Sequence, residues 1–167
     1  MLHTTVPLAD AVGKHISDLC PFSIAKDNQQ NHCAHFVSHM LGYDFGHTCK
    51  TFTWTDKQRE APGANLRVND VFNRCRLRGL WSERPLHLQG CLIFVTHTSN
   101  VVELGHQLQM RDSRWKHIGI HLGGTVWHYS ITGRQVVSET LSAFNERFTR
   151  AYQMSGKTVE FYFGEFI

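Results

Sequence analysis

Two adjacent glycines, Gly123 and Gly124, constrain the fold of this chain more than any other feature of its sequence. They separate two β-rich segments, residues 116–122 and 125–130, and Gly-Gly is a typical two-residue turn of a β-hairpin. Because side chains alternate along each strand and cross-strand partners share a face, this turn determines which side chains lie together. One face should be core, with Ile118, Ile120, Leu122, Thr125, Trp127 and Tyr129; the other carries His117, Gly119, His121, Val126, His128 and Ser130.

The second face brings two histidines within reach of each other. His117 and His128 become diagonal neighbours, and Gly119 opposite His128 leaves room for the two rings. An imidazole base whose tautomer is fixed by a second polar group is the arrangement that nucleophilic catalysis requires. The alternative is a pair of surface histidines on a half-exposed hairpin. His121 shares this face and is expected only to line a pocket.

An early cysteine supplies a candidate nucleophile. Asn31 is a typical helix N-cap, and the residues after Cys33 place Phe36, Val37, Met40 and Leu41 on one helical face. Cys33 lies in the first turn, where the positive end of the helix dipole favours a thiolate. The alternative is a small buried core cysteine, which is the commoner environment of this residue.

Three segments and one further histidine resemble the NlpC-type, papain-like cysteine peptidases, best known as bacterial cell-wall endopeptidases. Residues 33–37 (Cys-Ala-His-Phe-Val) resemble the nucleophile motif Asp-Cys-Ser-Gly-φ-Val, and residues 90–95 (Gly-Cys-Leu-Ile-Phe-Val) resemble the following strand. Residues 117–123 (His-Ile-Gly-Ile-His-Leu-Gly) resemble the histidine strand, and His128 stands at the spacing of the third polar residue. The resemblance implies Cys33 as nucleophile, His117 as base and His128 as the orienting residue.

The same resemblance implies an α+β, papain-like fold in which N-terminal helices, including the nucleophile helix, pack on a mostly antiparallel β-sheet. It implies a single domain over 1–167 with an insertion around 45–87. The expected activity is hydrolysis of peptide or amide bonds, foremost in peptidoglycan stem peptides or cross-links, as in an antibacterial effector or lysis protein. The alternative is an acyltransferase, thioesterase or protein-directed amidase with an intracellular substrate. A non-enzymatic binding module is the other class kept open.

Composition limits the partners and the compartment. The chain has 167 residues, 41% of them hydrophobic, and a formal net charge of +3, which suits one globular domain and favours no nucleic acid. Five cysteines, an odd count, indicate synthesis in a reducing compartment.

Residues 1–10 lack a signal-peptide pattern and no stretch is long enough for a membrane span. A cell-wall enzyme of this kind would be made in the bacterial cytoplasm and delivered by a specialised route, with an immunity or delivery protein as partner.

A metal centre is also considered. His32, His35 and His39 share a helical stripe beside Cys33, and zinc binds such residues. Cys33 and His35, however, face differently on a helix, and the chain has no Cys-x-x-Cys or His-Glu-x-x-His motif. We therefore expect no metal and no cofactor.

The remaining pattern predicts helices followed by strands, which is typical of an α+β fold. The expected segments are helices at 7–19, 68–75 and 139–150, strands at 92–95, 135–137 and 159–163, an irregular segment at 44–65 and a polar connection at 97–115.

Overall fold

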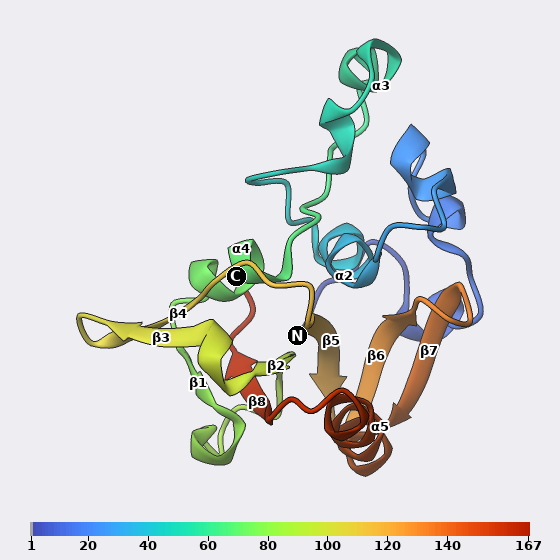
Figure 1. The fold of residues 1–167 in the computed structure, drawn as a ribbon. Helices are drawn as coiled ribbons and strands as arrows, with labels where there is room; N and C mark the ends of the chain where they lie inside the picture. Colours follow the sequence, from blue (N-terminus) through green and yellow to red (C-terminus); the bar gives the residue numbers. More distant parts are fainter. Residues whose placement is uncertain (1) are drawn as a thin grey trace. The chain divides into compact units, whose positions relative to one another are not determined.

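A computed structural model describes residues 2–167 and confirms the α+β class, with a mostly antiparallel sheet and a few helices (Figure 1). The chain divides into two compact units. The first contains Met1–Arg67 and Trp127–Ser138, and the second contains Val68–Val126 and Glu139–Ile167. Two compact units can be two halves of one domain or two domains. The single domain expected over 1–167 therefore stays a prediction. The insertion around 45–87 also stays a prediction.

Short helices make up most of the first unit. They are α1 (Leu8–Ala11), η1 (Ile16–Asp18), η2 (Ser23–Lys26), α2 (Cys33–Leu41), η3 (Cys49–Thr51) and α3 (Trp54–Gln58). The predicted helix over 7–19 is wrong. Gly13 has a φ of +85°, its N–H donates to the Val136 carbonyl, and the Lys14 carbonyl accepts from the Val136 N–H. Pairing with the distant Val136 replaces the helical hydrogen bonds that the local pattern predicts.

Helix α2 begins at Cys33, as predicted. The Cys33 N–H donates to Asn31 Oδ1 at 3.0 Å, although His32 occupies the N-cap position itself. The helix ends at Gly42, whose φ of +72° is the left-handed cap that glycine adopts without strain. Nearly every side chain between these ends is buried, so α2 is a core helix.

The second unit is built on strands in the order β1 (Arg78–Leu80), β8 (Val159–Gly164), β2 (Gly90–His97) and β5 (Lys116–Leu122), with antiparallel neighbours. Its interior strand, β2, is a continuous apolar run buried on both faces, as expected for a strand with two partners. The polar connection predicted over 97–115 instead contains a hairpin of β3 (Val101–Leu104) and β4 (Gln107–Met110), turning at Gly105.

Helices cover both faces of β2. On one face, Ile93 and Val95 pack with Phe144 and Tyr152 of α5 (Leu141–Met154). On the other, the ring of Phe94 lies 5.0 Å from the ring of Phe72 in α4 (Val68–Arg74). Val126, at the start of β6 (Thr125–Ser130), belongs to the α5 cluster. Strand β6 is followed by β7 (Gln135–Thr140).

The predicted Gly-Gly turn is confirmed. Gly123 and Gly124 lie between β5 and β6 with φ values of +56° and +84°, the pair of positive angles that a type I′ turn requires. Val95 is the cross-strand partner of His117, and Val95 and Val126 share the α5 cluster, so His117 and Val126 share a face as predicted. Among residues 2–167, no helix combines the length and apolarity needed to cross a membrane.

Gly164 provides a test of packing between α4 and the sheet. A Cβ there would lie 2.6 Å from Cys75 Sγ and 3.0 Å from the nearest carbon of the Phe94 ring. Both distances are shorter than an ordinary van der Waals contact. We expect Gly164→Ala to lower the free energy of unfolding by about 1–3 kcal/mol, measured by urea denaturation. Combining it with Cys75→Ala should recover part of that loss, whereas strictly additive effects would exclude the Cys75 contact as the cause.

Candidate active site and candidate metal centre

The predicted nucleophile lies where the sequence places it. Cys33 is the first residue of α2, in the first unit, and only 2% of its side chain surface is exposed. The position gives the thiol the positive end of a helix, as expected for a reactive cysteine. Its low exposure means that a substrate reaches the sulfur only after neighbouring side chains move.

The predicted base, His117, lies in β5 of the second unit. Its ring centroid is 4.6 Å from that of Phe148 and 6.0 Å from that of Phe144, both in α5, and the residue is 8% exposed. The alternative of a surface histidine is therefore wrong for His117. The aromatic rings restrict the orientation of the imidazole, which a positioned base requires.

The predicted orienting residue, His128, lies in β6 and is 2% exposed. Its neighbour Tyr129 faces the start of α2, because the Tyr129 ring lies 5.8 Å from that of His32 and its hydroxyl accepts from the Ile16 N–H. Alternation along the strand then directs His128 to the opposite face of β6. Cys33 and His128 belong to the first unit and His117 to the second, so the assignment of one triad stays a prediction.

His121 is buried in β5 against Trp81, at 5.1 Å between ring centroids. Its Nδ1 atom has no hydrogen-bond partner among the described residues. Burial lowers the pKa of His121, and the charge of Arg84 lowers it further. This histidine is therefore held in its neutral form, and its expected role in lining a pocket stays a prediction.

A cavity of about 580 Å³ lies in the second unit, beside β1, β3 and β4. Its lining includes Arg76, Arg78 and His106 but none of the predicted catalytic residues. Arg78 donates to the carbonyls of Leu108 and Cys75, so its guanidinium is used to hold the β4 segment. The cavity does not mark the predicted active site.

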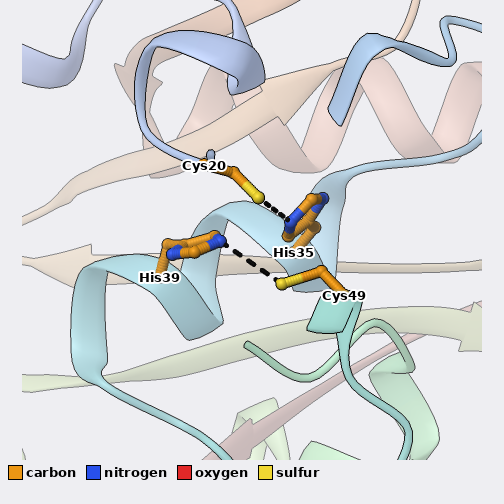
Figure 2. A group of neighbouring side chains, drawn as sticks. All are labelled: Cys20, His35, His39 and Cys49. Carbon is orange, nitrogen blue, oxygen red and sulfur yellow. Dashed lines mark hydrogen bonds between the residues drawn. The ribbon is translucent and has the colours of Figure 1, made fainter. Parts of the chain in front are cut away.

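A second group of side chains, which the sequence did not predict as a set, lies in the first unit. Cys20, His35, His39 and Cys49 bring two sulfurs and two ring nitrogens within 4.8 Å of one another (Figure 2). Cys20 follows η1, the two histidines stand one turn apart on α2, and Cys49 opens η3. All are buried except His39, which is half-buried. Two thiols and two imidazoles at this spacing are a ligand set that zinc takes.

Close contacts join the four side chains in pairs. Cys20 Sγ lies 3.2 Å from His35 Nε2, and Cys49 Sγ lies 3.6 Å from His39 Nε2, the two dashed contacts in Figure 2. Each sulfur also accepts a backbone hydrogen bond. The Phe22 N–H donates to Cys20 Sγ at 3.4 Å, and the Ala64 N–H donates to Cys49 Sγ at 3.2 Å. Such donors stabilise negative charge on sulfur, and a cysteine that binds a metal carries that charge as a thiolate.

A chain of hydrogen bonds fixes the tautomer of His35. The Asp27 carbonyl can only accept, so His32 Nε2, at 2.8 Å from it, carries a hydrogen. Burial lowers the pKa of His32, which keeps this ring neutral and leaves its Nδ1 without a hydrogen. His35 Nδ1, at 2.9 Å from His32 Nδ1, must then donate. The lone pair of His35 is therefore on Nε2, the atom that faces Cys20.

The ionisation of the cluster follows from the same contacts. Hydrogen bonding from the Cys20 thiol, with the neighbouring imidazoles, lowers the pKa of Cys49, and the same bond raises the pKa of Cys20. Burial lowers the pKa of His35 to about 4. These pKa directions favour a thiolate on Cys49, a thiol on Cys20 and a neutral His35.

Sequence reasoning found half of this cluster. The helical stripe in the sequence contains His35 and His39, but it places Cys33 beside them, whereas the structure places Cys20 and Cys49 there. The two cysteines stand 15 and 10 residues from the histidines that they contact. The available signal was a His-x-x-x-His pair on a helix with single cysteines on either side. Because of this cluster, the expectation that the chain binds no metal stays a prediction.

Comparisons with protein-family models, curated proteins and solved structures found no match to this chain. The resemblance to NlpC-type peptidases therefore rests on the quoted motifs alone.

His121 allows a test of pH dependence. An unfolded histidine titrates near pH 6.5, and the folded-state pKa of His121 lies below that value, so acid favours the unfolded chain. The stabilising contribution is present above about pH 6.5 and is lost as the pH falls toward the folded-state pKa. We expect His121→Leu to lose less stability than the parent between pH 7.5 and pH 5, measured by urea denaturation. An equal loss in both proteins would contradict this, and His106→Leu, at an exposed turn, serves as the control.

Proposed function

We propose that this chain is a cysteine amidase or endopeptidase that uses Cys33 as its nucleophile. The observation that supports the proposal is the position of Cys33 at the first residue of the buried helix α2 in an α+β fold. A thiol at a helix N-terminus is favoured as thiolate, the form that attacks a carbonyl carbon. The papain-like architecture is part of this proposal.

The proposed reaction assigns one role to each residue. Cys33 Sγ attacks the carbonyl of a peptide or amide bond, and His117 takes the thiol proton and later transfers it to the leaving amine. Water then hydrolyses the thioester. His128 orients His117. This role is proposed because the two histidines lie on the same hairpin.

The Cys33 backbone N–H is the proposed oxyanion donor. It already donates to Asn31 Oδ1, so the developing oxyanion must share or displace that acceptor. Asn31 is exposed, which permits its side chain to turn away when substrate binds. The pairing would also hold the N–H in place before substrate arrives.

The substrate proposed from the motif resemblance is a peptidoglycan stem peptide or cross-link. Reaching it from a bacterial cytoplasm would involve a specialised delivery route, with an immunity or delivery protein as partner. Acyl transfer or amide hydrolysis on an intracellular lipid or protein is the runner-up, because the same thiol and imidazole serve both reactions.

Replacing the nucleophile tests the proposal directly. Cys33→Ala should abolish cleavage of purified muropeptides, read by mass spectrometry, while circular dichroism stays unchanged, because removing one sulfur leaves a small cavity. Cys91→Ala is the matched control: Cys91 is also buried, in β2, and burial raises the pKa of its thiol to about 11. Cleavage by a folded Cys33→Ala protein would exclude Cys33. Failure of Cys33 to react with a thiol-alkylating reagent would favour a binding module.

Replacing the histidines separates their roles. We expect His117→Ala to lower kcat/KM by about 10²–10⁴-fold, the usual contribution of a general base, and His128→Ala to cost less. His128→Asn should retain part of the rate because its amide oxygen can still accept the ring N–H. His121→Ala should be the mildest change. Equal and total loss in the His117 and His128 variants would contradict this division.

Because His117 packs against Phe144 and Phe148, its alanine variant also creates a cavity. His117→Gln keeps more of the side-chain volume and separates loss of the base from loss of packing. The pH dependence of Cys33 alkylation provides the second measurement, since removing a paired imidazole changes the profile even when turnover is undetectable.

A further inference from the structure

We propose that Cys20, His35, His39 and Cys49 form a closed, four-coordinate structural zinc site within the first unit. The proposal is independent of the amidase proposal, because none of the four residues has a role in the reaction described above. His35 and His39 stand on α2, whereas Cys20 follows η1 and Cys49 opens η3 (Figure 2).

The geometry is close to that of a tetrahedral centre. Zinc bonds of about 2.3 Å to sulfur and about 2.0–2.1 Å to nitrogen place ligand atoms roughly 3.3–3.8 Å apart. Here the four atoms already lie within 4.8 Å of one another, with sulfur-to-nitrogen distances of 3.2 Å and 3.6 Å in the two contacts dashed in Figure 2. Small side-chain rotations would complete the coordination.

The outer contacts match the needs of a metal centre. Each sulfur accepts one backbone N–H, from Phe22 or Ala64, which offsets thiolate charge. His35 uses its Nδ1 atom to contact His32, which in turn contacts the Asp27 carbonyl, so His35 Nε2 is the nitrogen that faces the centre. Orientation of a ligand histidine by a hydrogen bond to its other nitrogen is a common feature of zinc sites.

The donor set identifies the metal and its role. Two sulfurs and two imidazoles in a tetrahedral arrangement favour zinc over magnesium or calcium, which prefer oxygen. Four protein ligands leave no open position for water or substrate, so the site is structural and not catalytic. Burial of Cys20, His35 and Cys49 agrees with a closed centre.

Such a site would join three parts of the first unit. It would tie the segment after η1 and the segment at η3 to the middle of α2. The first segment is an irregular stretch after η1, and the second is the three-residue 3-10 helix η3. Metal binding supplies folding free energy in small or loop-rich structures of this kind.

The experiment uses the full chain, purified without chelator, under reducing conditions and with any affinity tag removed. Elemental analysis should find one zinc per chain. Replacement of zinc by Co²⁺ should give the intense visible bands of tetrahedral coordination and a thiolate charge-transfer band. Limited proteolysis should cut the segments around Cys20 and Cys49 faster after zinc removal, and re-addition of Zn²⁺ should restore protection.

Variants connect these signals to the four residues. Cys49→Ser and His39→Ala should lose zinc and the cobalt spectrum, whereas His39→Cys should retain metal because a third thiolate can replace the imidazole. Cys75→Ser and Cys91→Ser are the matched controls, since both cysteines are buried in the second unit, and they should keep one zinc. If the ligand variants fail to fold, the cobalt spectrum and the protection of the parent chain remain decisive.

Three results would overturn the proposal. The first is a folded, reduced chain that holds no zinc and gains none from an equimolar addition of Zn²⁺. The second is a Cys20–Cys49 disulfide in the protein purified without oxidant, found by mass spectrometry of unreduced peptides. The third is full zinc retention by folded Cys49→Ser and His39→Ala variants, which would place the metal on other residues.

Discussion

Burial of α2 is the constraint on which the chemistry of the first unit depends. A helix surrounded by protein cannot leave its polar side chains unpaired without a large cost in free energy. Cys33, His35 and Ser38 all lie on this helix and all are buried. His35 meets the requirement through His32 and Cys20, whereas the Ser38 hydroxyl has no partner among the described residues. A polar cluster in the core is therefore a consequence of placing these residues on α2.

Two chemistries are proposed on the same helix, and helix geometry separates them. Cys33 and His35 are two residues apart, so they point roughly 200° away from each other around the axis. His35 and His39 are four apart and lie on one side, where Cys20 and Cys49 reach them. The thiol proposed to react and the thiols proposed to bind metal are thus on different sides of α2, and neither set needs the other's atoms.

Elements that depend on near neighbours were predicted well. The start of α2 follows from Asn31 and the apolar spacing after Cys33, and the hairpin turn follows from Gly123 and Gly124. The predictions that failed did so for two different reasons. Residues 7–19 carry a helical pattern, yet Gly13 and Lys14 bond to Val136 of β7 instead. The β3–β4 hairpin lacks the strong apolar alternation that marks a strand in a sequence.

The sequence by itself determined the local placement of Cys33 at a helix start and of His117, His121 and His128 on a hairpin. These features depend on contacts within a few residues, where turn geometry and helical spacing act directly. Only the tertiary structure decided that His117 packs against Phe148 of α5, and that Cys20 and Cys49 meet His35 and His39. The first contact depends on how a strand and a helix that are distant in the sequence meet. The cysteine contacts depend on the path of loops without periodicity, and a sequence pattern cannot encode the point at which two such loops approach the same face of a helix.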